Sequence, residues 1–286
     1  MKGYLVKMRI LGLDIGGTAI KWGISEGGEL VDTGTCPSFA SSGAERLFEV
    51  VFSLLDSLRF DMLGVSTAGI VAPDGSIRYA NENIPRYTGV RLKALLEERY
   101  SVPVAVLNDI AAAAYSERSS LDDYYYVALG TGVGGIYVKD GVVLSGASGV
   151  AGQIGYLPSQ RGGIIDLDAS TRGLGAACGG DVRGLFASAK GGDATAERIL
   201  DDWCGEVAAM LTQIVGYINP RVIVIGGGIS EQGDALLDRI RHRLADIPEP
   251  YRGSFEIRVA TGGNLAAVNG IINYVKEVYH EHFREN

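Results

Sequence analysis

The stretch MRILGLDIGGTAIKWGISEGGELVDTGT, residues 8–35, decides how the fold is interpreted. Its first part, residues 8–15, has the apolar run of a short buried strand, with one acid, Asp14, near the carboxyl end. Residues 20–24 and 29–33 predict two further strands that follow in a hairpin arrangement. A carboxylate at the end of a buried strand is costly unless something binds it, so Asp14 is a candidate ligand for a magnesium ion.

The turn after the first strand consists of Gly16, Gly17 and Thr18. Glycine has no side chain to keep a ligand away from the backbone N–H groups, and the threonine adds a hydroxyl, so this turn is a candidate phosphate-binding loop. Lys21, on the following strand, is a further candidate for holding phosphate. A lysine on a hairpin strand is more often simply solvated, and both interpretations stay open.

The chain repeats this plan in residues 125–146, YYVALGTGVGGIYVKDGVVLSG. An apolar strand leads into a turn made of Gly130, Thr131 and Gly132, and two short strands follow. Two copies about half a chain apart predict two similar domains. We expect their glycine turns to face one another across a cleft that holds the substrates.

Between the two copies, strands and helices alternate, which is typical of an α/β fold. One buried strand, residues 103–107, stops at Asn108 and Asp109, and a helix of small residues, 110–117, begins at once. Either residue suits the start of a helix. Ligands also gather at the carboxyl ends of strands in α/β sheets, where Asp109 could accept a proton from a substrate hydroxyl. Both interpretations are open from the sequence.

The second half of the chain predicts a long glycine-rich loop over residues 145–166 and a long amphipathic helix over 195–217. A buried strand then runs into Gly226, Gly227 and Gly228, which suits the sugar or base of a nucleotide but also any tight strand-to-helix turn. The final helix, 265–283, is long enough to return to the first domain.

The composition excludes several classes of protein. The chain has 286 residues, 47% hydrophobic and 21% charged, which indicates a globular protein of about two domains. A net charge of −8 argues against a nucleic-acid-binding face, and no apolar run approaches the length of a membrane span. The three cysteines, Cys36, Cys178 and Cys204, have neither metal-binding nor redox spacing, so we expect a cytoplasmic protein.

Four segments in this order resemble motifs of the ROK family of sugar kinases: LGLDIGGTAIKWG, LNDIAAAA, LGTGVGG and VIVIGGGIS. The resemblance covers nearly the whole chain and implies two similar actin/hexokinase-like (ribonuclease H-like) domains with a cleft between them. The implied first domain is residues 1–115, completed by the helix 265–286, and the second is 116–264. The implied activity is transfer of the γ-phosphoryl group of ATP to a sugar hydroxyl, with Mg²⁺ as cofactor.

The resemblance also implies roles for individual residues. Asp109 corresponds to the general base. The implied sugar-binding residues are Gly69, Asn83, Asn108, Asp109, Gln153, Tyr156 and Asp166. The implied ATP-binding residues are Asp14, Gly16, Gly17, Thr18, Lys21, Gly130, Thr131, Gly132, Gly226, Gly227 and Gly228, with Asp14 also near the Mg²⁺.

Three of these positions depart from the family pattern. Gln153 and Tyr156 stand where the family has a glutamate and a histidine, and Asp166 stands where it has a second glutamate. Because the family's histidine also binds a structural zinc with nearby cysteines, we expect no zinc site here. The substitutions change charge and reach around the sugar, so they leave the preferred sugar open.

We therefore expect a hexose 6-kinase, most simply a glucokinase, with N-acetylmannosamine or N-acetylglucosamine kinase as alternatives. The donor is ATP or polyphosphate, and a homodimer is expected. A non-catalytic sugar- or nucleotide-binding or sensing protein of the same fold stays open. A dinucleotide enzyme fits poorly, because a hairpin and not a helix follows residues 130–135. A sugar-sensing repressor also fits poorly, because the charge is acidic and only seven residues precede Met8.

Overall fold

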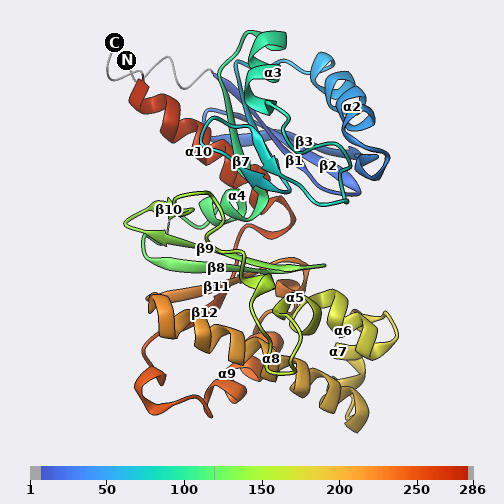
Figure 1. Ribbon diagram of the computed structural model, residues 1–286, viewed down its shortest axis with the longest axis vertical. Helices are drawn as coiled ribbons and strands as arrows, with labels where there is room; N and C mark the ends of the chain where they lie inside the picture. The colour runs from blue at the N-terminus through green and yellow to red at the C-terminus, as the bar shows by residue number, and fades with distance from the viewer. Residues whose placement is uncertain (1–7, 119, 283–286) are drawn as a thin grey trace. The chain divides into compact units, whose positions relative to one another are not determined.

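The computed structural model describes residues 8–118 and 120–282. The chain divides into two compact units. The described residues of unit 1 are 8–118, 147–149 and 265–282, and those of unit 2 are 120–146 and 150–264. Figure 1 shows both units and labels elements where there is room.

Unit 1 contains a sheet of five strands in the order β3-β2-β1-β4-β7. The strands are β1 (Arg9–Ile15), β2 (Ala19–Glu26), β3 (Glu29–Pro37), β4 (Met62–Thr67) and β7 (Val104–Asn108). A separate hairpin consists of β5 (Ile70–Val71) and β6 (Ile77–Tyr79). The helices of unit 1 are α2 (Ala44–Asp56), α3 (Leu92–Tyr100), α4 (Asp109–Tyr115) and α10 (Ala266–His282).

Unit 2 repeats this sheet in the order β10-β9-β8-β11-β12. Its strands are β8 (Tyr124–Leu129), β9 (Val133–Lys139), β10 (Val142–Leu144), β11 (Val222–Gly226) and β12 (Glu256–Val259). Its helices are α5 (Ile165–Asp168), α6 (Thr171–Cys178), α7 (Val182–Lys190), α8 (Ala194–Ile218) and α9 (Asp234–Leu244).

The two sheets also share their strand directions. In each, the first three strands along the chain pair antiparallel, the fourth strand pairs parallel with the first, and the fifth pairs parallel with the fourth. The predicted duplication of a strand, a glycine turn and a hairpin is therefore confirmed.

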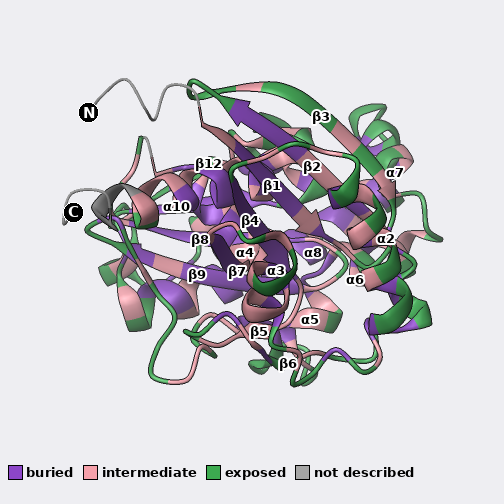
Figure 2. Ribbon diagram, turned by 90° about the horizontal axis from the view of Figure 1, so that it is seen from above, coloured by how far each residue is buried: buried purple, intermediate pink, exposed green. Residues whose placement is uncertain are grey.

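The side chains of β1 alternate between two apolar clusters of unit 1, one on each face of the sheet. Leu11 and Leu13 face a cluster that includes α2, whereas Ile10 belongs to a cluster with residues of α10. On this second face a Cβ built at Gly12 would lie 2.8 Å from Ile272 Cγ1. Glycine at that position therefore lets α10 pack closely on the sheet, and the central strands are among the buried elements in Figure 2.

The core of unit 2 forms where α8 packs against the sheet, with residues of β8 and β11 and of α9 in one apolar cluster. The predicted long helix is confirmed as α8. The glycine-rich segment expected to be a loop contains a short 3₁₀ helix, η2 (Ile154–Tyr156), and leads into α5. α6 and α7 follow in a part of the chain for which the sequence predicted no element.

Candidate active site

Three parallel strands of unit 1 end at the same edge of the sheet. The register pairs Asp14 of β1 with Ser66 of β4, and Thr67 of β4 with Asn108 of β7. Ser66 Oγ donates a hydrogen bond to Asp14 Oδ1 at 2.9 Å. The sheet therefore brings the two acids predicted at strand ends, Asp14 and Asp109, to one edge of unit 1.

Asn108 is the residue before α4, and its side chain caps the helix. Its Oδ1 accepts hydrogen bonds from the N–H groups of Ile110 at 3.0 Å and Ala111 at 3.4 Å. Its Nδ2 donates to Asp109 Oδ1 at 2.8 Å and to Gly69 O at 2.9 Å. The helix-capping interpretation is thus confirmed for Asn108, and the same side chain fixes the orientation of the neighbouring carboxylate.

The carboxylate of Asp109 has one occupied and one available oxygen. Oδ1 accepts hydrogen bonds from Asn108 Nδ2 and from the Ile110 N–H, the latter at 2.9 Å. Oδ2 accepts none from residues 8–118 or 120–282. Burial raises the pKa of Asp109 from 3.8 to about 6, and the charge of Asp14 adds to this effect. Such a carboxylate is ionised at neutral pH yet basic enough to take a proton from a bound hydroxyl.

Asp14 lies in a related environment. Its pKa is also raised by burial, while the Ser66 hydrogen bond and the charge of Lys21 act in the opposite direction. Lys21 is the antiparallel partner of Asp14 on β2. Asp14 thus combines an oriented carboxylate with a nearby cation at the edge where the glycine turn begins.

Gly69 is the residue at which this arrangement depends on glycine. Its φ of +102° is disfavoured for other residues, and a Cβ built there would lie 2.6 Å from Tyr79 O. Its carbonyl oxygen accepts the Asn108 hydrogen bond. Asn83 lies on the exposed segment after β6, where its N–H group donates to Asn81 Oδ1 at 3.1 Å.

The first glycine turn joins β1 to β2. The Gly16 N–H donates to Ala19 O at 3.0 Å and closes the turn. Gly17 and Thr18 are exposed, and their N–H groups have no hydrogen-bond partner among the described residues. Two unpaired donors beside Asp14 are suited to a phosphate group with its metal ion.

The second glycine turn joins β8 to β9 in the same way. The Gly130 N–H donates to Gly132 O at 3.0 Å, and Gly130 O accepts from the Thr171 N–H at 2.8 Å. The N–H groups of Thr131 and Gly132 have no partner within the described part of the chain. As far as the described residues go, each unit therefore presents a glycine turn with two unpaired backbone donors.

The three glycines after β11 have different surroundings. A Cβ at Gly226 would lie 2.0 Å from the Tyr126 hydroxyl, and one at Gly227, where φ is +87°, would lie 2.2 Å from Leu129 O. Gly228 has open space around it and begins a 3₁₀ helix, η3 (Gly228–Gln232), which precedes α9. Packing inside unit 2 thus explains two of the glycines, and Gly228 is the one with room for a ligand.

The remaining assigned sugar residues belong to unit 2. Gln153 precedes η2, and its side chain makes no hydrogen bond within the described residues. Tyr156 is 65% exposed. Asp166 instead contacts the second glycine turn and Arg172. Gly69, Asn83, Asn108 and Asp109 are in unit 1, so each unit carries part of the assigned set.

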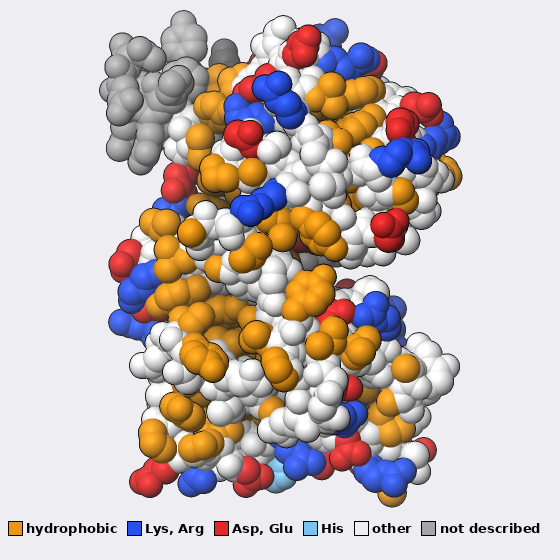
Figure 3. Space-filling model, viewed as in Figure 1, with side chains coloured by type: hydrophobic (Ala, Val, Ile, Leu, Met, Phe, Trp, Pro, Cys, Tyr) orange, Lys and Arg blue, Asp and Glu red, His pale blue; other side chains and the backbone are white. Residues whose placement is uncertain are grey.

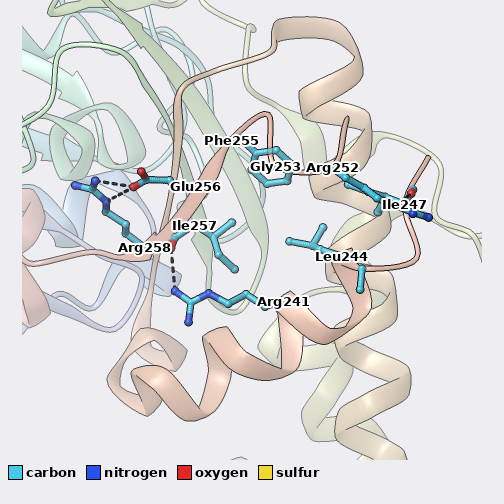
Figure 4. Close-up of a pocket in the computed structure, with 10 residues that line it drawn as sticks. Arg241, Leu244, Ile247, Arg252, Gly253, Phe255, Glu256, Ile257 and Arg258 are labelled. Atoms are coloured by element: carbon cyan, nitrogen blue, oxygen red, sulfur yellow. Dashed lines mark hydrogen bonds and ion pairs between the residues drawn. The ribbon is translucent and has the colours of Figure 1, made fainter. Parts of the chain in front are cut away.

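Some hollows of the molecule lie away from these residues. One, of about 670 Å³, lies between the end of α9 and the start of β12 (Figure 4). Its arginines already have partners: Arg241 donates to Ile257 O, Arg252 donates to Ile247 O, and Arg258 pairs with Glu256. No assigned site residue lines it, so it is separate from the candidate active site.

Further observations concern metal-binding groups, membrane-spanning helices and the distribution of surface charge. Among the described residues, no three or more histidine, cysteine, aspartate or glutamate side chains group so as to hold a metal ion, and no helix has the length and apolarity to cross a membrane. On the face seen in Figure 3, acidic and basic side chains are interspersed.

Comparisons with known proteins agree with the motifs. The profile of the ROK family matches residues 10–278. The chain belongs to the ROK family. It is 32% identical to an uncharacterized protein of Clostridium perfringens, over 94% of this chain and 98% of the relative. It is 29% identical to a glucokinase of Halalkalibacterium halodurans, over 91% and 92% of the two chains.

Comparison with solved structures indicates the same fold. The ROK hexokinase from Thermus thermophilus is similar with a TM-score of 0.74 and 28% identity, covering 96% of this chain and 100% of that one. Other curated relatives are β-glucoside kinases and N-acetylmannosamine kinases. The expected α/β, actin/hexokinase-like fold class is thereby confirmed, and the relatives include glucokinases, β-glucoside kinases and N-acetylmannosamine kinases.

Sequence reasoning missed several contacts of the site. Ser66 was not singled out, although a polar residue inside a fully buried strand is a signal for a specific partner. Arg172 and Val133 were not singled out, and both contact Asp166. Val133 lies 33 residues from Asp166 in the chain, and no local pattern links the two.

Proposed function

We propose that the protein is an ATP-dependent hexose 6-kinase of the glucokinase type. The observation that carries this proposal is the carboxylate of Asp109: one oxygen is fixed by Asn108 and the helix N-terminus, and the other is available, with a pKa raised to about 6. This is the arrangement expected of a general base for a sugar hydroxyl. Membership of a family whose relatives are sugar kinases supports the same reaction.

In the proposed reaction the 6-hydroxyl of the sugar donates its proton to Asp109 Oδ2. The sugar oxygen forms a bond to the γ-phosphorus as the bond from that phosphorus to the β–γ bridging oxygen breaks, and ADP leaves with the electron pair. Asn108 keeps Oδ1 occupied, so the proton is directed to Oδ2. Much of the rate would come from positioning and from charge stabilisation around the transferred group.

The phosphates of ATP would accept hydrogen bonds from the glycine turns, and the base and ribose would lie near Gly228. Mg²⁺ usually binds one or two carboxylates together with substrate phosphates and water. Asp14 suits that role because it is an oriented carboxylate beside the first glycine turn. Such an ion would neutralise part of the phosphate charge. Gly69, Asn83, Asn108, Gln153 and Tyr156 are proposed to contact the sugar.

A coupled assay of ADP release tests the proposal. Purified protein is given Mg·ATP or polyphosphate with glucose, mannose, fructose, N-acetylglucosamine, N-acetylmannosamine or a β-glucoside, and the product is identified by ³¹P and ¹³C NMR. We expect ADP and sugar 6-phosphate in equal amounts, with glucose as the best acceptor. Preference for an N-acetylated sugar would replace glucokinase by the corresponding amino-sugar kinase, whose curated relatives are of comparable similarity.

The same assay distinguishes an enzyme from a binding protein. ATP binding measured by calorimetry, without sugar-dependent ADP for any acceptor, would show a non-catalytic nucleotide-binding or sensing protein. Polyphosphate consumption in the absence of ATP would identify the donor as polyphosphate.

A further inference from the structure

Asp166 forms a hydrogen bond to the end of the second glycine turn. Its Oδ1 accepts from the Val133 N–H at 2.6 Å. A Cβ built at Gly132 would lie 2.6 Å from the same oxygen. The carboxylate thus contacts the backbone of the turn closely, and glycine at position 132 makes this approach possible because it has no side chain.

The start of the turn is held by the same segment of chain. The Thr171 N–H donates to Gly130 O at 2.8 Å. Gly130 and Val133 are the two ends of the turn, so residues 166–171 form hydrogen bonds to both of them. Between these ends lie the unpaired N–H groups of Thr131 and Gly132.

This supporting segment, residues 164–173, is itself anchored in the core of unit 2. Ser170 is fully buried, and its carbonyl oxygen accepts a hydrogen bond from Trp203 Nε1 of α8 at 3.2 Å. Its Oγ accepts from the Gly173 N–H at 3.1 Å and caps α6. A Cβ at Gly173 would lie 2.0 Å from Leu167 O, so the segment doubles back tightly on itself. The second glycine turn is therefore held by a segment that is itself anchored by buried contacts and hydrogen bonds.

Arg172 lies on this support. Its Nη2 donates to Asp166 Oδ2 at 2.7 Å, while about half of its side chain, 53%, stays exposed. A carboxylate beside a phosphate-binding turn repels the phosphate, and a paired guanidinium offsets that charge. The exposed N–H groups of Arg172 are further donors of the geometry that phosphate prefers.

We propose that Asp166 is a positioning residue for the donor phosphates, that it acts through the second glycine turn, and that Arg172 neutralises it and contacts the same phosphates. The proposal rests on the proposed phosphotransferase function. It differs from the sugar-binding role that family resemblance assigns to Asp166, because it gives the two carboxylate oxygens the Val133 N–H and the Arg172 guanidinium as their partners. The ligand is a phosphoanhydride chain, in ATP or in polyphosphate.

Steady-state kinetics with ATP and sugar varied separately test this assignment. Asp166→Ala loses a charge-assisted hydrogen bond to the turn, so we expect the KM for ATP to rise about tenfold, with the KM for sugar changed less than about twofold. Asp166→Asn keeps an acceptor for the Val133 N–H and should restore most of the ATP affinity. Asp168→Asn is the matched control, since Asp168 lies on the same short helix but bonds Ser159 instead.

Arg172→Ala gives an independent measurement that leaves the turn's own hydrogen bonds in place. We expect a rise of about three- to tenfold in the KM for ATP and a weaker dependence of that KM on salt, because one phosphate contact is lost. Arg258→Ala removes an exposed arginine on β12 that is paired with Glu256. This control should change neither the KM for ATP nor the dependence of that KM on salt.

Two results would overturn the proposal. A rise in the sugar KM with an unchanged ATP KM in Asp166→Ala would assign Asp166 to the sugar. Equal dissociation constants of wild type and Arg172→Ala for both ATP and tripolyphosphate, measured by calorimetry, would exclude the phosphate contact. Calorimetry also separates this proposal from the kinase assignment, since it reports phosphate binding even if no sugar is phosphorylated. If Asp166→Ala does not fold, the KM values of Asp166→Asn and Arg172→Ala for ATP and sugar test the proposal instead.

Discussion

Replacing Asp109 by asparagine should stabilise the protein while removing its activity. The carboxylate has a pKa of about 6 in the folded chain against an ordinary value of 3.8. Because the folded value is the higher one, the folded chain binds the proton more tightly. The contribution of Asp109 to the free energy of unfolding therefore falls as pH rises between about 4 and 6, and is then constant. At about 1.4 kcal/mol for each pH unit, ionised Asp109 costs up to about 3 kcal/mol above pH 6.

Asparagine has nearly the same shape and keeps an oxygen that can accept from the Ile110 N–H, but it carries no charge. We expect Asp109→Asn to raise the free energy of unfolding by about 2 kcal/mol at pH 7.5, or the melting temperature by about 4 °C. The difference should shrink as the pH approaches 4. Its kcat should fall by about 10²- to 10⁴-fold, the usual contribution of a general base.

Thermal unfolding followed by circular dichroism between pH 4.5 and 8 measures this effect. Asp74→Asn is the control, because hydrogen bonds from Ser76 lower the pKa of Asp74, so this variant should be slightly less stable than wild type at neutral pH. An Asp109→Asn variant that is no more stable than wild type at pH 7.5, or whose extra stability is the same at every pH, would contradict a raised pKa for Asp109.

Three further outcomes follow from the site. The value of kcat/KM for the sugar should rise with pH and reach half its maximum near pH 6, where Asp109 loses its proton; a flat profile from pH 5 to 8 would contradict a base with that pKa. Gly69→Ala should cost about 1–3 kcal/mol of stability and raise the sugar KM, because the methyl group meets Tyr79 O. Gly89→Ala, at a similar φ with open space, should cost less, as denaturant titration would show. Asn108→Ala should lose about 1 kcal/mol of helix capping and lower kcat more than ATP affinity, and equal losses in both would contradict its role in orienting the base.

The fold was predictable because its signals are local and repeated. The apolar runs at residues 8–15 and 125–129, each followed by a glycine turn and a hairpin, predict strands whatever the rest of the chain does. The structure places both in sheets of the same strand order. Ser170 and Asp181 cap the starts of α6 and α7, so each was a local signal for the start of a helix. The small residues of these two helices hid their apolar periodicity, and the helices were not predicted.

The chemistry of the site was only partly predictable. The sequence suggested Asp14 and Asp109 from their places at strand ends. It could not show that Asn108 occupies one oxygen of Asp109, or that Asp14 helps to raise the pKa of Asp109, because both depend on strands paired through tertiary structure. For the same reason the contact between Asp166 and the second glycine turn has no counterpart in the sequence pattern.

In the proposed reaction the available oxygen of Asp109 takes the proton of a sugar hydroxyl as the γ-phosphoryl group is transferred. Single-turnover formation of sugar phosphate from [γ-³²P]ATP, compared between wild type and Asp109→Asn at saturating substrates, tests it most directly. We expect rapid formation by wild type, a rate lower by about 10²-fold or more in the variant, and unchanged ATP binding in calorimetry. A variant that forms sugar phosphate at nearly the wild-type rate would contradict it.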